Sequence, residues 1–321
     1  MIDMAQINRD RVGAEQQVLL VETYYGLRLA QEIVVVRDET FYAMEKHFQD
    51  ALKLEANGLI NKAERLYFQV NRDEAKRELE VAVKELQVIQ NTFKTLVKMS
   101  NPESVRPIST LFIHPDLPSL DYFKSLISNQ NYLVNGIRVQ HSIQEKELKI
   151  ARSGYIPNIE VFGKQTVYSD GIPKNLVPRT MVGVGFSWNL FDGLDREKKI
   201  SQAKISRYIL DIQKDKLIDD LGLVVDKFYN QTQIALDNVT ALKTTIEMSR
   251  ELVRTRQRAF NEGMATSIEV IDAELILSKV RIAALMAYFE FDSGLINLLA
   301  VCGIPDAFHE YRLTGQDETS L

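Results

Sequence analysis

Apolar residues recur every three or four positions along most of the chain, which is the period of an amphipathic helix. The first stretch of this kind, residues 6–57, contains no proline, and residues 59–99 contain neither proline nor glycine. Proline and glycine are the residues that most oppose a helix interior. The pattern therefore predicts two long helices, one on each side of Gly58.

A segment rich in proline, residues 100–118, interrupts this pattern, and further helices are predicted at 119–153, 194–261 and 265–302. The longest of these would measure about 100 Å at the usual helical rise. A helix of that length cannot surround a compact core. It favours a coiled coil or an elongated bundle.

The last of these helices carries a heptad seam. Positions that step alternately by three and four residues are apolar, except at Ser278 and Asp292. A helix of a coiled coil presents such a seam to its neighbours. The seam consists of Ile268, Ile271, Leu275, Ser278, Ile282, Leu285, Phe289, Asp292, Ile296 and Leu299.

Between residues 157 and 190 the hydrophobic period changes to two, which predicts a β-hairpin with a longer loop. One face of its first strand carries Ile159 and Val161, and the other carries Glu160 and Lys164. Each predicted strand has about the length of a tilted strand that crosses a membrane. An ordinary soluble hairpin alternates equally well, so both interpretations remain open at this point.

The two halves of the chain are related by an internal repeat. When Gly58 is aligned with Gly263, an offset of 205 residues, Glu64 falls on Glu269. In both copies the glycine separates two long helices, and glycine commonly supplies the left-handed residue at a helix end. We therefore expect two helical hairpins, each with a glycine at its tip.

Composition and charge exclude several functions. The formal net charge of −5, without a basic cluster, argues against binding to nucleic acid. Cys302 is the only cysteine and the four histidines lie far apart, so we expect no metal site. The sequence has neither a phosphate-binding loop nor a nucleophile elbow, and we expect no cofactor and no enzymatic activity. No apolar run is long enough for a transmembrane helix.

Two acids, Glu269 and Asp272, lie three residues apart just after Gly263. This spacing puts them on one face of a helix. Such a pair is compatible with a catalytic dyad, a metal site, a ring of charge in an assembly, or solvated surface at a helix N-terminus, where the helix dipole favours acids.

Several segments together resemble the TolC-type outer membrane efflux proteins. The resemblance covers nearly the whole chain, and no single motif carries it alone. The segments are ARSGYIPNIEVFG, VGVGFSWNLFDG, ANGLINKAERLYFQV and AFNEGMATSIEVIDAELILSKVRIAALMAYFEFDSGLINLLAVCG.

The resemblance implies a mainly α fold of long antiparallel coiled-coil helices, with a β-hairpin that contributes to a trimeric membrane β-barrel. The implied protein is a homotrimeric channel subunit of a tripartite efflux or type I secretion system, which exports small molecules or polypeptides. It would sit in the outer membrane and periplasm of a Gram-negative bacterium, in contact with outer membrane lipid. Its implied protein partners are a periplasmic adaptor and an inner-membrane transporter.

The resemblance also implies roles for particular residues. Glu269 and Asp272 would form a cation-selective ring at the pore constriction, as carboxylate rings do in cation channels. Gly58, Glu64 and Gly263 would form the helical tips that contact the adaptor. The basic residue that often pairs with the first-tip acid is replaced by Ala265 here, and Arg256 or Arg258 are the available substitutes. Tyr168 and Trp188 would anchor the barrel at the membrane interface, with buried packing as the alternative.

By this alignment, residues 1–99 are the helical part of the first repeat, 100–118 a linker, 119–303 the second repeat and 304–321 a C-terminal tail. The chain lacks a signal peptide and the family's first β-hairpin. Three protomers with one hairpin each would supply fewer strands than the eight of the smallest membrane barrels. We therefore expect an N-terminally truncated chain.

The main alternative function is a periplasmic adaptor or coiled-coil scaffold of an export complex. Adaptors also contain a helical hairpin, but they place one such hairpin between flanking β domains. In this sequence two predicted helical hairpins flank one β-hairpin. That order favours the channel subunit.

Overall fold

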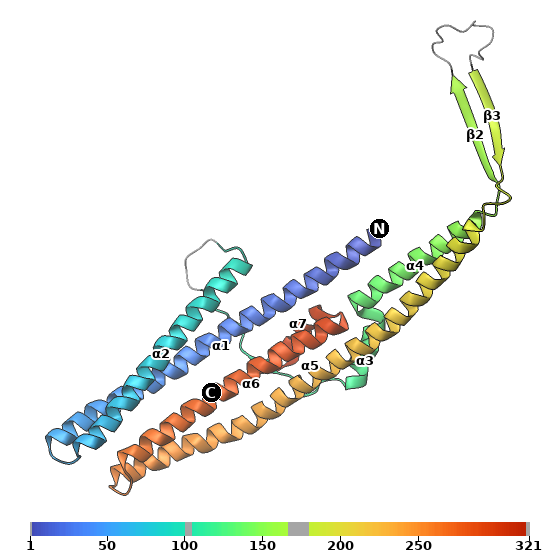
Figure 1. Ribbon diagram of the computed structural model, residues 1–321. Coiled ribbons are helices and arrows are strands. Elements are labelled where there is room, and N and C mark those ends of the chain that lie inside the picture. Colours follow the sequence, from blue (N-terminus) through green and yellow to red (C-terminus); the bar gives the residue numbers. More distant parts are fainter. Residues whose placement is uncertain (1, 100–104, 166–179, 319–321) are drawn as a thin grey trace. The chain divides into compact units, whose positions relative to one another are not determined.

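The computed structural model describes residues 2–99, 105–165 and 180–318, and most of these residues are helical (Figure 1). The helices are α1 (Ile2–Ala56), α2 (Lys62–Leu96), α3 (Leu120–Gln130), α4 (Tyr132–Ser153), α5 (Asp195–Asn261), α6 (Ser267–Cys302) and α7 (Phe308–Thr314), with a 3-10 turn at Pro305–Ala307. The strands are β1 (Phe112–Ile113), β2 (Asn158–Gln165), β3 (Thr180–Ser187) and β4 (Gln316–Asp317). Long helices with a β-hairpin between them confirm the predicted fold class.

The chain forms two compact units. The helical unit comprises Gln6–Tyr132 and Asp220–Leu321, and the hairpin unit comprises Met1–Ala5 and Leu133–Asp219. Helix α5 contributes its first part to the hairpin unit and its remainder to the helical unit.

The helix predicted at 119–153 is divided into α3 and α4 by Asn131. Asn131 has extended backbone angles (φ −63°, ψ 130°), and its side-chain Nδ2 donates to the carbonyl of Val301 at 2.7 Å. An asparagine side chain that bonds elsewhere offers the backbone an alternative to the helix. The break thus arises from a tertiary contact with α6, which the local period could not reveal.

Both helical hairpins turn at the predicted glycines. Gly58 and Gly263 have left-handed φ values of 72° and 73°. The residue after each glycine bonds back over five positions: Leu59 N–H donates to Leu54 at 2.9 Å, and Met264 N–H donates to Ala259 at 2.8 Å. Together with the bonds of the glycine amides themselves, these form a Schellman motif at each tip.

The heptad seam of α6 faces the interior of the helical unit, as predicted. Ile271, Ser278, Ile282, Leu285, Asp292, Ile296 and Leu299 are buried, and Ile268, Leu275 and Phe289 are partly buried. Burying this seam against several helices removes a large apolar area from water and stabilises the unit. The whole helix is more apolar than a surface helix, since the buried set extends beyond the seam.

Polar side chains on α6 pair with α1. Ser278 accepts a hydrogen bond from Thr40 at 2.8 Å, and His47 lies 2.9 Å from Glu274. Nearer the other end, Asn297 donates to Glu22 at 2.7 Å. Buried polar groups are tolerated where a partner satisfies them, so these contacts fix which face of α1 meets α6.

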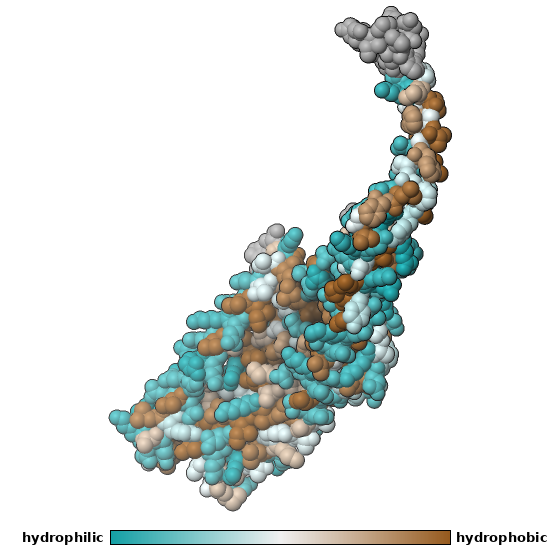
Figure 2. All heavy atoms as spheres, turned by 45° about the vertical axis from the view of Figure 1, so that its right-hand side comes forward, coloured by the Kyte–Doolittle hydropathy of each residue, from teal (hydrophilic) through white to brown (hydrophobic). Residues whose placement is uncertain are grey.

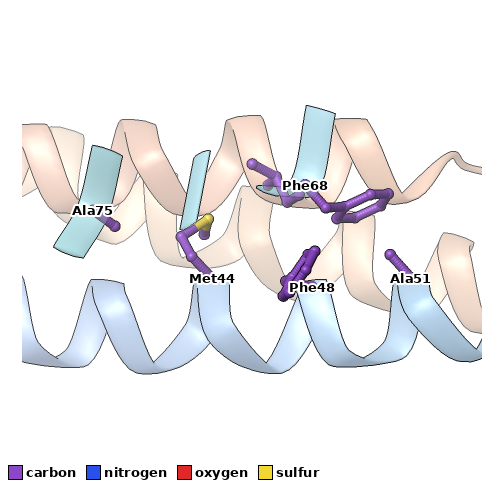
Figure 3. Packing of buried hydrophobic residues seen from close by; sticks show 6 residues of the cluster. Met44, Phe48, Ala51, Phe68 and Ala75 are labelled. Atoms are coloured by element: carbon purple, nitrogen blue, oxygen red, sulfur yellow. The ribbon is translucent and has the colours of Figure 1, made fainter. Parts of the chain in front are cut away.

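An apolar cluster joins α1, α2 and α6 near the tips. In Figure 3, Met44, Phe48 and Ala51 project from α1 toward Phe68 and Ala75 of α2. Ile271 of α6 completes the buried set. The first helical hairpin and the start of α6 therefore share one core.

The segments predicted as linker and tail both contain structure. Strand β1 pairs antiparallel with β4 (Phe112 with Asp317 and Ile113 with Gln316). Phe112 is fully buried, with its ring centroid 6.1 Å from that of Phe291 and 5.6 Å from that of Phe308. Each strand has only two residues and its partner is distant in sequence, so the hydrophobic pattern could not predict either strand.

In the hairpin unit, β2 and β3 pair antiparallel with Ile159 opposite Phe186 and Val161 opposite Val184. These side chains share one face, and all of them are exposed. Glu160 lies on the other face, opposite Gly185. Hydrophobic side chains are visible along the hairpin in Figure 2. The predicted alternation is confirmed for the described residues, and the connecting loop lies outside them.

Candidate functional site

The two acids at the second tip lie in the first turns of α6. Thr266 caps the helix, and its hydroxyl accepts from the Glu269 amide at 3.4 Å. The Glu269 carboxylate accepts from Arg256 of α5 at 3.1 Å. Both side chains of this pair are more than two-fifths exposed, and exposed ion pairs contribute at most about 1 kcal/mol. Glu269 is thus lightly held within its own hairpin.

Asp272 links the second hairpin to the first. Its carboxylate accepts a hydrogen bond of 2.7 Å from the hydroxyl of Tyr67 on α2. Burial and this bond to a carboxylate raise the pKa of Tyr67 above its ordinary value. The phenol therefore stays protonated and able to donate. The contact joins the two helical hairpins near their tips.

Sequence reasoning missed Tyr67 and the use of Arg256. A signal for Tyr67 was present, because Tyr67 and Asp272 are separated by 205 residues, the repeat offset. In this pair, equivalent positions of the two repeats meet near the tips. The offset that relates Glu64 to Glu269 also relates Tyr67 to Asp272, three residues further along.

Glu64 has a local role in the structure. Its backbone N–H donates to the side-chain oxygen of Asn61 at 2.9 Å, and its carboxylate accepts from the backbone N–H of Asn61 at 3.3 Å. These two bonds form a capping box at the start of α2. Arg256 contacts Glu269 instead of Glu64. Within the described chain Glu64 contacts its own helix end, so the suggested pairing of Glu64 with Arg256 or Arg258 stays a prediction.

The residues that follow the tip glycines are apolar and exposed. The exposed fraction is 71% for Leu59 and 73% for Met264. Neither belongs to the cluster of Met44 and its neighbours. Both tips therefore carry one exposed apolar side chain directly after the turn.

Of the two predicted membrane anchors, Trp188 is half exposed, and its indole Nε1 donates to the carbonyl of Tyr155 at 3.3 Å. Tyr168 lies outside the described residues. Trp188 thus has an exposed apolar body and a satisfied polar edge, as interfacial tryptophans do.

In the described parts of the chain, no group of three histidine, cysteine or carboxylate side chains is placed to hold a metal ion. Within the same ranges, none of the helices combines the length and the apolar character that crossing a bilayer requires. The free thiol of Cys302 is buried, and burial raises its pKa to about 12. It is therefore a poor nucleophile.

The family model described as outer membrane efflux protein matches residues 128–303. No curated protein matches the chain in sequence.

Solved outer-membrane channels share the fold. The MtrE channel of Neisseria gonorrhoeae has a TM-score of 0.75 at 15% identity, over 94% of this chain and 69% of MtrE. The outer membrane protein VceC of Vibrio cholerae has a TM-score of 0.71 at 14% identity, over 94% of this chain and 72% of VceC. The outer-membrane channel OprN has a TM-score of 0.75 at 15% identity, over 94% of this chain and 68% of OprN. At these identities the similarity concerns the fold.

Proposed function

The chain belongs to the outer membrane efflux protein family, and from that premise we propose that it is a channel subunit of a tripartite efflux or type I secretion system. Three copies would enclose a tunnel through which small molecules or polypeptides leave the cell. The β2–β3 hairpin would lie in the outer membrane and the long helices in the periplasm. The proposed conduit needs no catalytic residue.

The observation that carries this proposal is the exposed apolar face of the hairpin. Val161, Val182 and Val184 are each more than 70% exposed on one face. The opposite face carries Glu160 and Lys164. A strand with one lipid-facing and one lumen-facing side requires this alternation, because a charge that faces lipid near the bilayer midplane costs about 2–4 kcal/mol.

Replacing Val161 with arginine is expected to remove most of the binding of the protein to lipid. The reason is that the new charge would sit on the lipid-facing side of β2. Flotation with vesicles of phosphatidylethanolamine and phosphatidylglycerol measures the bound fraction. Phe162→Arg, the next residue on the other face, is the matched control and should retain binding. Equal loss in both variants would contradict the assignment of faces.

At the helical tips, we propose that Gly58, Glu64 and Gly263 shape the contact with a periplasmic adaptor, which in turn joins an inner-membrane transporter. The exposed Leu59 and Met264 support this placement, since they extend apolar surface beyond the turns. Glu269 and Asp272 would line the constriction, repeated three times around the axis. A ring of carboxylates there would favour cations.

The double variant Glu269→Ala, Asp272→Ala is expected to lower the ratio of cation to anion permeability in planar bilayers, because it removes two charges per protomer from the constriction. The variant also breaks the bond between Tyr67 and Asp272. Tyr67→Phe separates the two effects, since it breaks this bond and keeps both charges. It should leave the selectivity unchanged. Unaltered selectivity in the double variant would remove both acids from the pore.

A further inference from the structure

Arg196 lies in the first turn of α5, where the chain returns from the hairpin to the helices. Its Nη1 donates to the carbonyl of Gly154 at 3.0 Å and its Nη2 to the carbonyl of Leu190 at 3.1 Å. Its Nε lies 2.7 Å from the carboxylate of Asp192, and only 12% of the side chain is exposed. Gly154 precedes β2, and Leu190 follows β3. One guanidinium therefore joins both ends of the hairpin to α5.

The ring of Tyr155 lies against this guanidinium. Its Cζ lies 4.9 Å from the ring centroid of Tyr155, and the Tyr155 hydroxyl donates to Glu197 of α5 at 2.6 Å. A Cβ atom on Gly154 would come within 3.2 Å of the Arg196 Cδ, so glycine lets the arginine stem lie against the backbone. Trp188 is tied to the same group through the carbonyl of Tyr155.

The backbone between Asp192 and Arg196 adopts an unfavourable conformation. Gly193 and Leu194 are consecutive left-handed residues, with φ values of 71° and 69°. A leucine rarely occupies this region. A residue keeps such a conformation only where the surrounding structure holds it in place, and residues of this kind are common at functional sites. Arg196 follows Leu194 by two residues and is tied to Leu190 and Asp192, which precede it, and these contacts supply that constraint.

We propose that Arg196 is the positioning residue that fixes the direction of the β2–β3 hairpin against α4 and α5, by clasping Gly154, Leu190 and Asp192 together. The positioning role of Arg196 is independent of the proposed function, and only the membrane role of the hairpin rests on it. The planar fork of arginine donates hydrogen bonds to both carbonyls while its charge stands in an ion pair with the Asp192 carboxylate. The single ammonium of lysine cannot replace these contacts.

Spin-label distances test this directly. Labels on cysteines introduced at Val182 in β3 and Ile205 in α5, both more than half exposed, report the direction of the hairpin within its unit. Cys302 is fully buried and stays unlabelled. In detergent, Arg196→Met and Arg196→Lys should broaden the distance distribution several-fold. The emission of Trp188, the only tryptophan in the sequence, should shift to longer wavelength.

Lys199→Met is the matched control. It removes a cation one turn further along α5, from an ion pair with Asp195 at 2.6 Å whose side chains are 63% and 55% exposed. Its distance distribution should equal that of the wild type. Asp192→Asn removes only the ion pair and keeps the contacts of Arg196 with both carbonyls. It should therefore broaden the distance distribution less than Arg196→Met.

The proposal would be overturned if Arg196→Met, Arg196→Lys and Asp192→Asn all keep a narrow distance distribution and unshifted Trp188 emission, with their helical content intact. The measurement uses neither a membrane nor transport. A failure of the clasp is therefore distinguishable from a failure of the proposed channel function.

Discussion

Replacing Gly303 with alanine is expected to lower the free energy of unfolding of the helical unit by about 2–5 kcal/mol. Gly303 ends α6 with a φ of 84°, and its amide and that of Ile304 donate to Ala300 and Leu299. A Cβ atom there would come within 2.3 Å of the carbonyl oxygen of Gln130. Because that atom is backbone, α3 and α6 would have to move apart.

The two tip glycines provide matched controls. Gly58 and Gly263 have φ values of 72° and 73° and end helices with the same hydrogen-bond pattern, but a Cβ atom on either meets nothing within 4 Å. Gly58→Ala and Gly263→Ala therefore carry the backbone cost alone, about 1–2 kcal/mol. Urea unfolding, followed by far-ultraviolet circular dichroism, compares the three. If Gly303→Ala costs no more than the tip variants, the close approach of α3 and α6 is wrong.

Most of the fold could be predicted from the sequence because its helices are long and strongly periodic. The seam on α6, the left-handed glycines at the tips and the alternation of β2 and β3 are local patterns that repeat over many residues. The break at Asn131 was missed because it depends on a bond to Val301, 170 residues away. The pairing of β1 with β4 was missed for the same reason, since each strand has two residues.

The candidate site was predictable in position and not in its contacts. The sequence placed Glu269 and Asp272 in the first turns of a helix after a tip glycine. The helical period predicts which face of a helix is apolar. It does not predict which polar side chain of another helix lies beside a given acid. Hence Tyr67 and Arg256 emerged as partners only from the folded chain.

Asp292 presents a different problem, because it is a charged residue type at a fully buried seam position. Within the described residues, neither oxygen of its carboxylate accepts a hydrogen bond of ordinary geometry, and the Phe112 amide N–H is only near enough to give a weak contact. Burial raises its pKa well above the ordinary value. The amide of Phe112 on β1 and the guanidinium of Arg312 on α7 oppose this rise only in part, and Glu318, after β4, adds to it. Tyr25 of α1 faces the same carboxyl.

The sign of the resulting pH dependence follows from proton binding. The folded chain keeps Asp292 protonated at a pH where the unfolded chain has already released that proton. Deprotonation therefore favours the unfolded state as the pH rises above the ordinary pKa of an aspartate, and the loss levels off above the raised pKa of the folded state. Each pH unit in this window costs about 1.4 kcal/mol.

Asp292→Asn is expected to stabilise the helical unit by an amount that grows from acidic to alkaline pH, because asparagine has nearly the same shape and does not titrate. Thermal unfolding of the variant and the wild type between about pH 4 and pH 8, a range that begins near the ordinary aspartate pKa, measures the difference in midpoint. Glu290→Gln, at an exposed position on the same helix, controls for the loss of a negative charge and should leave that difference small and flat. Asp292→Asn destabilisation that is absent at acidic pH and grows toward alkaline pH would show that the carboxylate is ionised and paired in the folded chain. In that case Arg312, which also contacts Asp317 at 2.7 Å, would be its partner.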